Sequence, residues 1–247
     1  MEGVDLNWAD LSEANLREAR LRAANLYRVN LQRASLSRAD LQGAHLDGAD
    51  LQEAELDEAD LLSANLSRAN LRQASLRGTD LRKADLHGAH LEGAILHEAN
   101  LQRVSLFDVH LQEASLYRAN LEGANLSWAN LRGASLYEAK LQGANLSRAG
   151  LQGANLGSAN LQQADLSGAD VRGARLDRAK LQAAILFEAD LQDADLTDAE
   201  LDTNTVLPNG DWWTAATDLT RFTQAAHPDF WRSDNPQSPA CRLPGRV

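Results

Sequence analysis

The sequence has almost no cysteine and few aromatic residues. Its single cysteine, Cys241, excludes an intrachain disulfide, so an oxidising compartment is not implied. Aromatic residues make up 5% of the 247 residues although 44% are hydrophobic, so the apolar fraction is almost entirely Leu and Ala. A core of two residue types indicates a repeated local environment.

The chain also lacks the apolar runs that mark signal peptides and membrane spans. It begins MEGVDLNWAD, with neither a basic start nor an apolar stretch. No segment approaches the roughly 20 apolar residues of a membrane helix. We therefore expect a cytoplasmic protein without a membrane span.

Lys and Arg are missing from two segments, so the net charge of −11 is unevenly distributed along the chain. Residues 40–60 carry eight acidic side chains and residues 188–201 carry six, with no Lys or Arg in either segment. The intervening residues 61–187 carry 14 basic and 11 acidic side chains. A nucleic-acid-binding protein would show the opposite overall sign, so we expect no direct binding to nucleic acid.

What the sequence has in abundance is leucine at every fifth position. From Leu6 to Leu201, 39 of 40 such positions are Leu and the other is Val171. Ala lies two residues earlier in 35 of the 40, and Asp, Asn or Ser lies between in 28. Leucines five residues apart would be spread around all sides of an α-helix and would alternate between the two faces of a β-strand, so neither element would have a single apolar face. The pattern predicts a short extended piece with Ala and Leu inward, then a turn for which Asn, Asp, Ser and Gly are suited.

The residue after each Leu indicates how many units close one coil. Gln occupies this position ten times, in a ten-residue register such as Gln32, Gln42 and Gln52, and never at the alternate positions. This alternation is compatible with four units per coil and incompatible with three. If four units close one coil, residues 20 apart stack. Charges alternate in one such column, with Glu, Arg and Glu at 18, 38 and 58 and again at 98, 118 and 138, and should pair between coils.

The repeat resembles the A-(D/N)-L-x-x signature of the pentapeptide-repeat family, for example ANLSR at 64–68 and at 144–148. The resemblance covers residues 4–206. It implies an all-β fold, a right-handed quadrilateral parallel β-helix or solenoid with four pentapeptides per coil and about ten coils. At the ~4.8 Å spacing of β-strands, the rod would be roughly 48 Å long, with a packed interior and no ligand cavity.

The repeat breaks down after residue 206, where aromatic residues become concentrated. Residues 207–232 include the turn signal Pro208-Asn209-Gly210. They hold five of the chain's 12 aromatic residues: Trp212, Trp213, Phe222, Phe230 and Trp231. Because a solenoid leaves its last coil open, we expect these five to cap the C-terminal end. Residues 233–247, with frequent Pro and Gly, are expected to be a disordered tail.

The N-terminal end has no comparable cluster. The repeat begins at Val4, so the first coil should expose a Leu and Ala face and unpaired backbone groups. Either the chain is a fragment or this end associates with something. We predict a homodimer through the N-terminal coil, because a two-fold contact hides both open ends at once.

The sequence contains no catalytic or cofactor motif. The P-loop, dinucleotide-binding, H-E-x-x-H and C-x-x-C patterns are absent, and carboxylates on a rod have no cleft that would perturb their pKa values. We therefore predict neither enzymatic activity nor a cofactor. His90 and His110 should stack, but no third ligand is evident, so we expect solvated side chains and no metal site.

One outward column combines aromatic and apolar residues. His97, Tyr117 and Tyr137 are 20 residues apart, and Ile95 lies beside them. An exposed aromatic ladder can be a partner site, although incidental stacking on a sheet face would give the same pattern. These four residues are our candidate partner surface.

These observations favour a non-enzymatic structural or interaction module that presents a rigid rod to an unknown protein partner. The resemblance implies an alternative. Some family members are similar to B-DNA in shape and charge, bind DNA gyrase or topoisomerase in its place, and protect it from quinolones. This chain shares the acidic charge and the rod shape. It departs in having Leu where those members often use Phe, no loop insertions between coils and a slightly basic middle, so we rank the DNA mimic second and an enzyme last.

Overall fold

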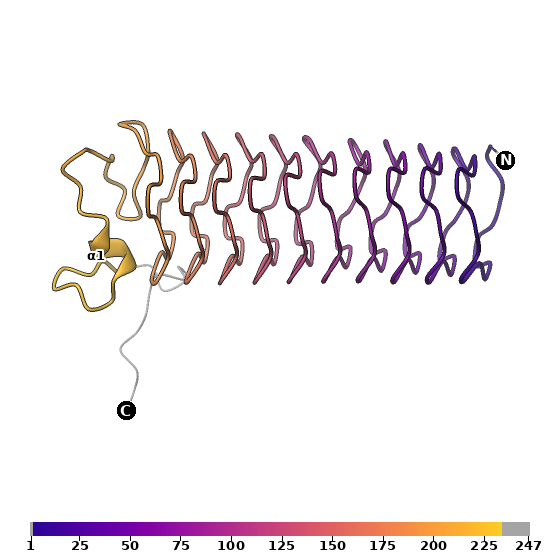
Figure 1. The fold of residues 1–247 in the computed structure, drawn as a ribbon, viewed down its shortest axis with the longest axis horizontal. Helices are drawn as coiled ribbons and strands as arrows, with labels where there is room; N and C mark the ends of the chain where they lie inside the picture. The colour runs from indigo at the N-terminus through magenta and orange to yellow at the C-terminus, as the bar shows by residue number, and fades with distance from the viewer. Residues whose placement is uncertain (1, 234–247) are drawn as a thin grey trace, which may run out of the picture.

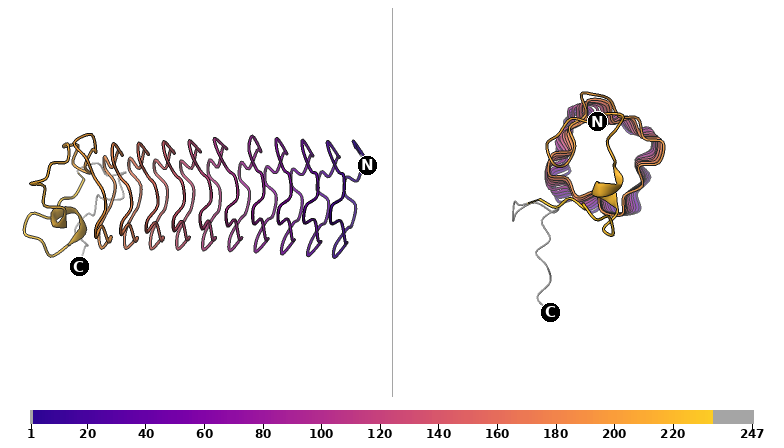
Figure 2. Two further views of the ribbon diagram at one scale, coloured as in Figure 1. Left: turned by 45° about the horizontal axis from the view of Figure 1, so that its top comes forward. Right: turned by 90° about the vertical axis from the view of Figure 1, so that its left-hand side faces the viewer.

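The computed structural model describes residues 2–233, which form a rod with an irregular structure at one end (Figure 1). Single-residue parallel bridges join each coil to the next, from Asp5 with Asn25 to Lys180 with Glu200, always 20 residues apart. This register confirms the predicted stacking of four pentapeptides per coil. The end-on view in Figure 2 shows the coils superimposed around one axis. Among residues 2–233 the only helix is α1, Thr220–Thr223, and none is long and apolar enough to cross a membrane.

Each pentapeptide consists of one bridging residue and one tight turn. In the first unit, Asp5 forms the bridge and the Ala9 N–H donates to the Leu6 carbonyl at 3.1 Å. Trp8, the second residue after the leucine, has a φ of 58°. Positive φ at the third of four turn residues is the pattern of a type II turn. The same conformation recurs at every fifth residue from Gly3 to Asp198.

Most of these positive-φ residues are not glycine. Of the 40 between Gly3 and Asp198, 28 carry a side chain, although the left-handed conformation costs an L-residue about 1–2 kcal/mol. A hydrogen bond to the next coil offsets this cost, as where the Trp8 N–H donates to the Tyr27 carbonyl at 2.9 Å. The prediction that Asn, Asp, Ser and Gly form the turn is therefore right only in part. Asn and Asp lie on the bridge and accept a hydrogen bond from the N–H two residues later.

Leucine and alanine fill the inside of the rod. From Leu21 to Leu191 the inward Leu and Ala side chains are almost inaccessible to solvent. A buried leucine contributes about 1.5–3 kcal/mol of transfer free energy, so these columns are the main source of stability. At both ends of the rod the inward leucines are only partly buried: Leu6, Leu11, Leu16, Leu196 and Leu201.

One junction between coils lacks backbone hydrogen bonds that the neighbouring junctions form. Where residues 83–88 face residues 103–108, the N–H groups of Lys83, Leu86, Gly88 and Ser105 make no backbone hydrogen bond to any residue in 2–233. One coil earlier, the Leu66 N–H donates to the facing carbonyl at 2.7 Å. Figures 1 and 2 both show a wider gap between two coils near the middle of the rod. We call this stretch, residues 83–88 and 103–108, the seam.

Two valines account for the seam. Val104 and Val109 occupy consecutive inward positions where most units carry alanine, and both are buried. Their extra methyl groups need space that an alanine spacing does not provide, so the coils separate on that side. A single valine does not have this effect. Around Val29 the ladder is intact, and the Asp50 N–H donates to the Val29 carbonyl at 2.9 Å.

Residues 202–223 accept hydrogen bonds from backbone N–H groups of the last coil. The Asp202 carboxylate accepts the Ala183 N–H at 2.8 Å, in the position where another coil would offer a carbonyl. At the end of α1, the Thr223 carbonyl accepts the Asp193 N–H at 2.7 Å. The predicted disordered tail lies outside the described residues, except for Ser233, which is buried.

The five aromatic residues expected to form the cap are not equivalent. Phe222 is buried, and Trp213 and Trp231 are partly buried against the Leu core. The rings of Phe222 and Trp231 lie 6.0 Å apart. Phe230 is half-buried, whereas Trp212 is 61% exposed. Phe222, Trp213 and Trp231 thus cover the end of the rod, and Trp212 is left on the surface.

Candidate functional site

The candidate partner surface forms a continuous ladder of rings. His97 and Tyr117 are in edge contact with ring centroids 5.7 Å apart, and Tyr117 and Tyr137 are stacked at 6.2 Å. Ile95 lies in the neighbouring bridge column, and all four side chains are half-buried. We call these four residues the tyrosine ladder.

Neighbouring residues hold the rings of the ladder in place. The Arg118 guanidinium lies 4.9 Å from the centre of the Tyr117 ring and forms an ion pair with Glu138 at 2.6 Å. The Tyr137 ring lies over Gly157, where a Cβ would come within 3.2 Å of its Cδ2 atom. A larger residue at this position would force the Tyr137 ring and the Asp177 carboxylate, 3.0 Å from the same Cβ, to shift. The ladder therefore offers preordered rings to a partner.

His97 is an uncharged member of the ladder. Its Nε2 atom lies 2.7 Å from the Ser115 hydroxyl. Burial lowers the pKa of His97, and the positive charge of Arg77 lowers it further. At neutral pH the ladder is thus aromatic and neutral along its length.

A second cluster contains the two stacked histidines. The rings of His90 and His110 lie 4.7 Å apart, as the 20-residue spacing predicts. The structure adds Glu92, whose Oε1 atom is 3.3 Å from His90 Nδ1. One ligand atom from each of these three residues lies within 4.8 Å of the other two. Sequence reasoning missed Glu92 because it compared residues 20 apart and not the two that flank Leu91 on one coil.

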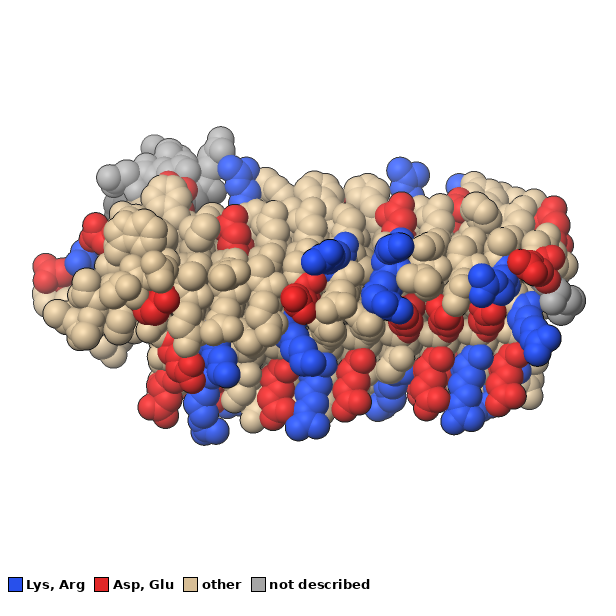
Figure 3. Space-filling model, turned by 90° about the horizontal axis from the view of Figure 1, so that it is seen from above, with Lys and Arg blue, Asp and Glu red and all other residues tan. Residues whose placement is uncertain are grey.

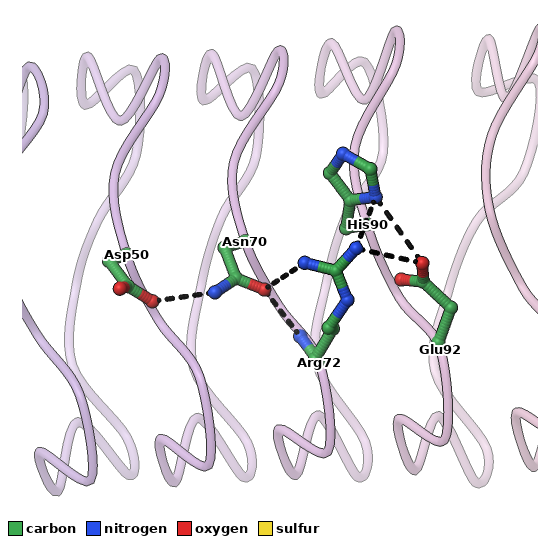
Figure 4. Close-up of polar contacts among 5 residues, drawn as sticks. All are labelled: Asp50, Asn70, Arg72, His90 and Glu92. Carbon is green, nitrogen blue, oxygen red and sulfur yellow. Dashed lines mark hydrogen bonds and ion pairs between the residues drawn. The ribbon is translucent and has the colours of Figure 1, made fainter.

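Arg72 completes the cluster from the preceding coil (Figure 4). Its Nη2 atom lies 3.0 Å from both Glu92 Oε1 and His90 Nδ1, and its Nη1 donates to Asn70 Oδ1 at 3.3 Å. Burial alone would raise the pKa of Glu92. The hydrogen bond from its own N–H, the contact with His90 and the charge of Arg72 together outweigh burial and lower that pKa. Glu92 is therefore a carboxylate at neutral pH, and Arg72 is the cation beside it.

The acidic side chains of residues 40–60 are partly neutralised by the coil before them. Glu53 and Glu58 form ion pairs with Arg33 at 3.1 Å and with Arg38 at 2.9 Å. Along one edge of the rod, acidic and basic side chains alternate, as predicted from the 20-residue column (Figure 3). Such exposed pairs contribute little to stability, but they reduce the negative potential of the acidic band.

Comparison with known proteins identifies the repeat. A profile of pentapeptide repeats matches eight overlapping stretches: residues 1–38, 34–73, 64–103, 74–112, 99–136, 110–148, 144–182 and 164–202. A comparison with curated protein sequences gives no match.

Solved structures of other proteins are similar to this chain. HetL, a pentapeptide repeat protein involved in heterocyst differentiation regulation from the cyanobacterium Nostoc sp. strain PCC 7120, is 38% identical, with 86% of this chain and 89% of HetL covered and a TM-score of 0.46. QnrB1, a plasmid-mediated fluoroquinolone resistance protein, is 18% identical, with 66% of this chain and 89% of QnrB1 covered and a TM-score of 0.48. The repeats matched from residue 1 to residue 202 show that this chain belongs to the pentapeptide repeat family.

Proposed function

We propose that this chain is a non-enzymatic interaction module of the cytoplasm, a right-handed four-sided rod whose tyrosine ladder binds a protein partner. The contact of three rings across three successive coils is the observation that carries the proposal. Tyrosine is enriched where proteins bind one another, because its ring offers apolar area and its hydroxyl offers a hydrogen bond. Membership in a family of repeat modules supports the same conclusion.

The surroundings of the ladder suit a protein surface. The rings are held by Arg118 and Gly157, so little side-chain entropy would be lost on binding. Ser115 and Ser135 flank them on the neighbouring bridge column, and Glu138 and Arg118 provide a charged rim. An apolar centre with a polar border is the usual composition of a transient protein interface.

Affinity capture from the native cell tests the proposal. Wild-type protein should retain a specific partner that the double variant Tyr117→Ala/Tyr137→Ala loses. Tyr27→Ala is the matched control, because it removes the third tyrosine of the chain from a different column and should leave capture unchanged. Circular dichroism should be the same for all three proteins. Equal capture by the double variant and the wild type would refute the ladder as the binding surface.

The acidic DNA mimic that binds gyrase or topoisomerase is the second candidate. The observation that favours it is a row of aspartates, Asp40, Asp60 and Asp80, on three consecutive coils. Arg22 lies 3.6 Å from Asp40 and Arg82 is paired with Asp80, which weakens the resemblance to a phosphate backbone. A gyrase supercoiling assay with and without a quinolone separates the two functions. Modulation that is lost in Asp60→Asn would favour the mimic, and its absence would favour the ladder.

A further inference from the structure

We propose that His90, Glu92 and His110 bind a divalent transition-metal ion of the Zn²⁺ class, which links two coils beside the seam. Two imidazoles and one carboxylate are a common ligand set for zinc, and three protein ligands leave a fourth position open. Tetrahedral bonds of about 2.0–2.1 Å place neighbouring ligand atoms about 3.3 Å apart. His90 Nδ1 and Glu92 Oε1 are separated by 3.3 Å.

The donor atoms already converge on a cationic group. A guanidinium can only donate hydrogen bonds, so His90 Nδ1 accepts from Arg72 and its ring proton lies on Nε2. Glu92 Oε1 accepts from the same Arg72 nitrogen. Both lone pairs therefore point to one position between them. The Arg72 side chain is 42% exposed, which leaves it free to turn outward when an ion takes that position.

Two buried oxygen atoms nearby lack a hydrogen bond among the described residues. They are Glu92 Oε2 and Gln112 Oε1. Gln112 occupies the same column as Glu92 on the next coil, two residues after His110. An unpaired buried acceptor is costly, and a cation would satisfy it. Gln142 Oε1 and Gln182 Oε1 are unpaired in the same way elsewhere on the rod, so it is Glu92 Oε2 that favours a positive ligand at this cluster.

The position of the cluster indicates what the ion would do. His90 and His110 belong to the same two coils that separate at the seam, directly after Gly88 and Asp108. Near the cluster the ladder closes again, with the Leu91 N–H donating to the His110 carbonyl at 2.8 Å. An ion held by residues from both coils would restrict opening at the edge of the seam. Metal binding is thus expected to slow local opening there, as any ligand specific for the closed state does.

Calorimetric titration of the untagged full chain with ZnCl₂ tests the site. We expect one Zn²⁺ per chain. Glu92→Gln and His110→Asn should each weaken binding at least tenfold, whereas the matched control His87→Asn, an exposed histidine on the same coil as His90, should change it less than twofold. Arg72→Gln should tighten binding, because it removes the competing cation. Wild-type affinity in both ligand variants, or unchanged affinity in Arg72→Gln, would overturn the proposal.

Hydrogen exchange gives a readout that does not depend on calorimetry. Zn²⁺ should slow exchange of the Leu91 and His110 amides, which donate hydrogen bonds between the two coils at the cluster, in the wild type and not in Glu92→Gln. The unliganded melting curves of all variants should first be compared, so that a folding defect is not mistaken for loss of a ligand. Uniform slowing along the whole rod, or slowing that persists in Glu92→Gln, would show that the ion does not bind between these two coils.

Discussion

Replacing both seam valines with alanine should close the seam at little net cost. Each Val→Ala change removes two methyl-sized groups, about 0.8 kcal/mol apiece with a further cavity cost, so roughly 2 kcal/mol per site. The double variant Val104→Ala/Val109→Ala should therefore lose about 4 kcal/mol from packing. Closing the coils would allow up to four backbone hydrogen bonds, at about 1 kcal/mol each. The two effects nearly cancel.

Val29→Ala is the matched control for this calculation. Val29 is as deeply buried as the seam valines, but the ladder around it is already complete. Its replacement gains no hydrogen bond and should cost the full ~2 kcal/mol. The double variant is thus expected to be less destabilising than one substitution elsewhere, although it removes twice as many methyl groups.

Denaturant unfolding and hydrogen exchange together decide the matter. Repeat proteins need not unfold in one step, so local exchange rates are the sharper measurement. Lys83, Leu86, Gly88 and Ser105 should become protected in the double variant to the level of the neighbouring coils. If the double variant instead loses twice the stability lost by Val29→Ala, and the four amides exchange as before, the valines do not cause the seam.

Three further predictions follow from packing and charge. Leu106→Asp would bury an unpaired charge and should cost several kcal/mol, whereas outward Gln162→Ala should cost under about 0.5 kcal/mol; equal melting temperatures would refute the inward assignment. The hydrogen bond from Arg82 lowers the pKa of Asp80 in the folded state. The stabilisation that the Asp80 carboxylate provides should therefore be complete above pH ~4 and should be lost as the pH falls through the pKa of Asp80 in the folded protein. In the Asp80→Asn variant, the free energy of unfolding should depend less on pH in this acidic range. The homodimer through the N-terminal coil stays a prediction: light scattering should show a dimer that Leu11→Asp converts to monomer, and a monomeric wild type at tens of micromolar would contradict it.

The stacking of the coils could be predicted because one sequence pattern decides it at every position. Leu and Ala at fixed spacing exclude an α-helix and a long strand, and the register of Gln32 and Gln42 requires an even number of units per coil. The resemblance to the pentapeptide-repeat family implies four units per coil, and the resulting 20-residue columns place His90 over His110 and Tyr117 over Tyr137. In a solenoid each coil contacts only its neighbouring coils, so the same contacts recur at a fixed separation along the sequence.

Other features were not predicted, for physical reasons that differ. Glu92 joins the histidine pair through the geometry of a turn, which spacing alone does not describe. The left-handed residues were not predicted because Glu and Arg have no preference for that conformation, and the hydrogen bond to the next coil that stabilises most of them is a contact between coils. The seam depends on two adjacent valines acting together. Each is an ordinary apolar residue when considered alone, as Val29 demonstrates.

A regular repeat cannot by itself distinguish one part of the rod from another. Packing makes nearly all inward positions Leu or Ala, while exposed outward positions are free to vary at a cost within about 0.5 kcal/mol. Specific binding must therefore come from outward residues that cooperate across coils, or from places where the inward pattern changes. The tyrosine ladder is of the first kind. The histidine and glutamate cluster combines both, because its ligands are outward residues on the two coils that Val104 and Val109 separate.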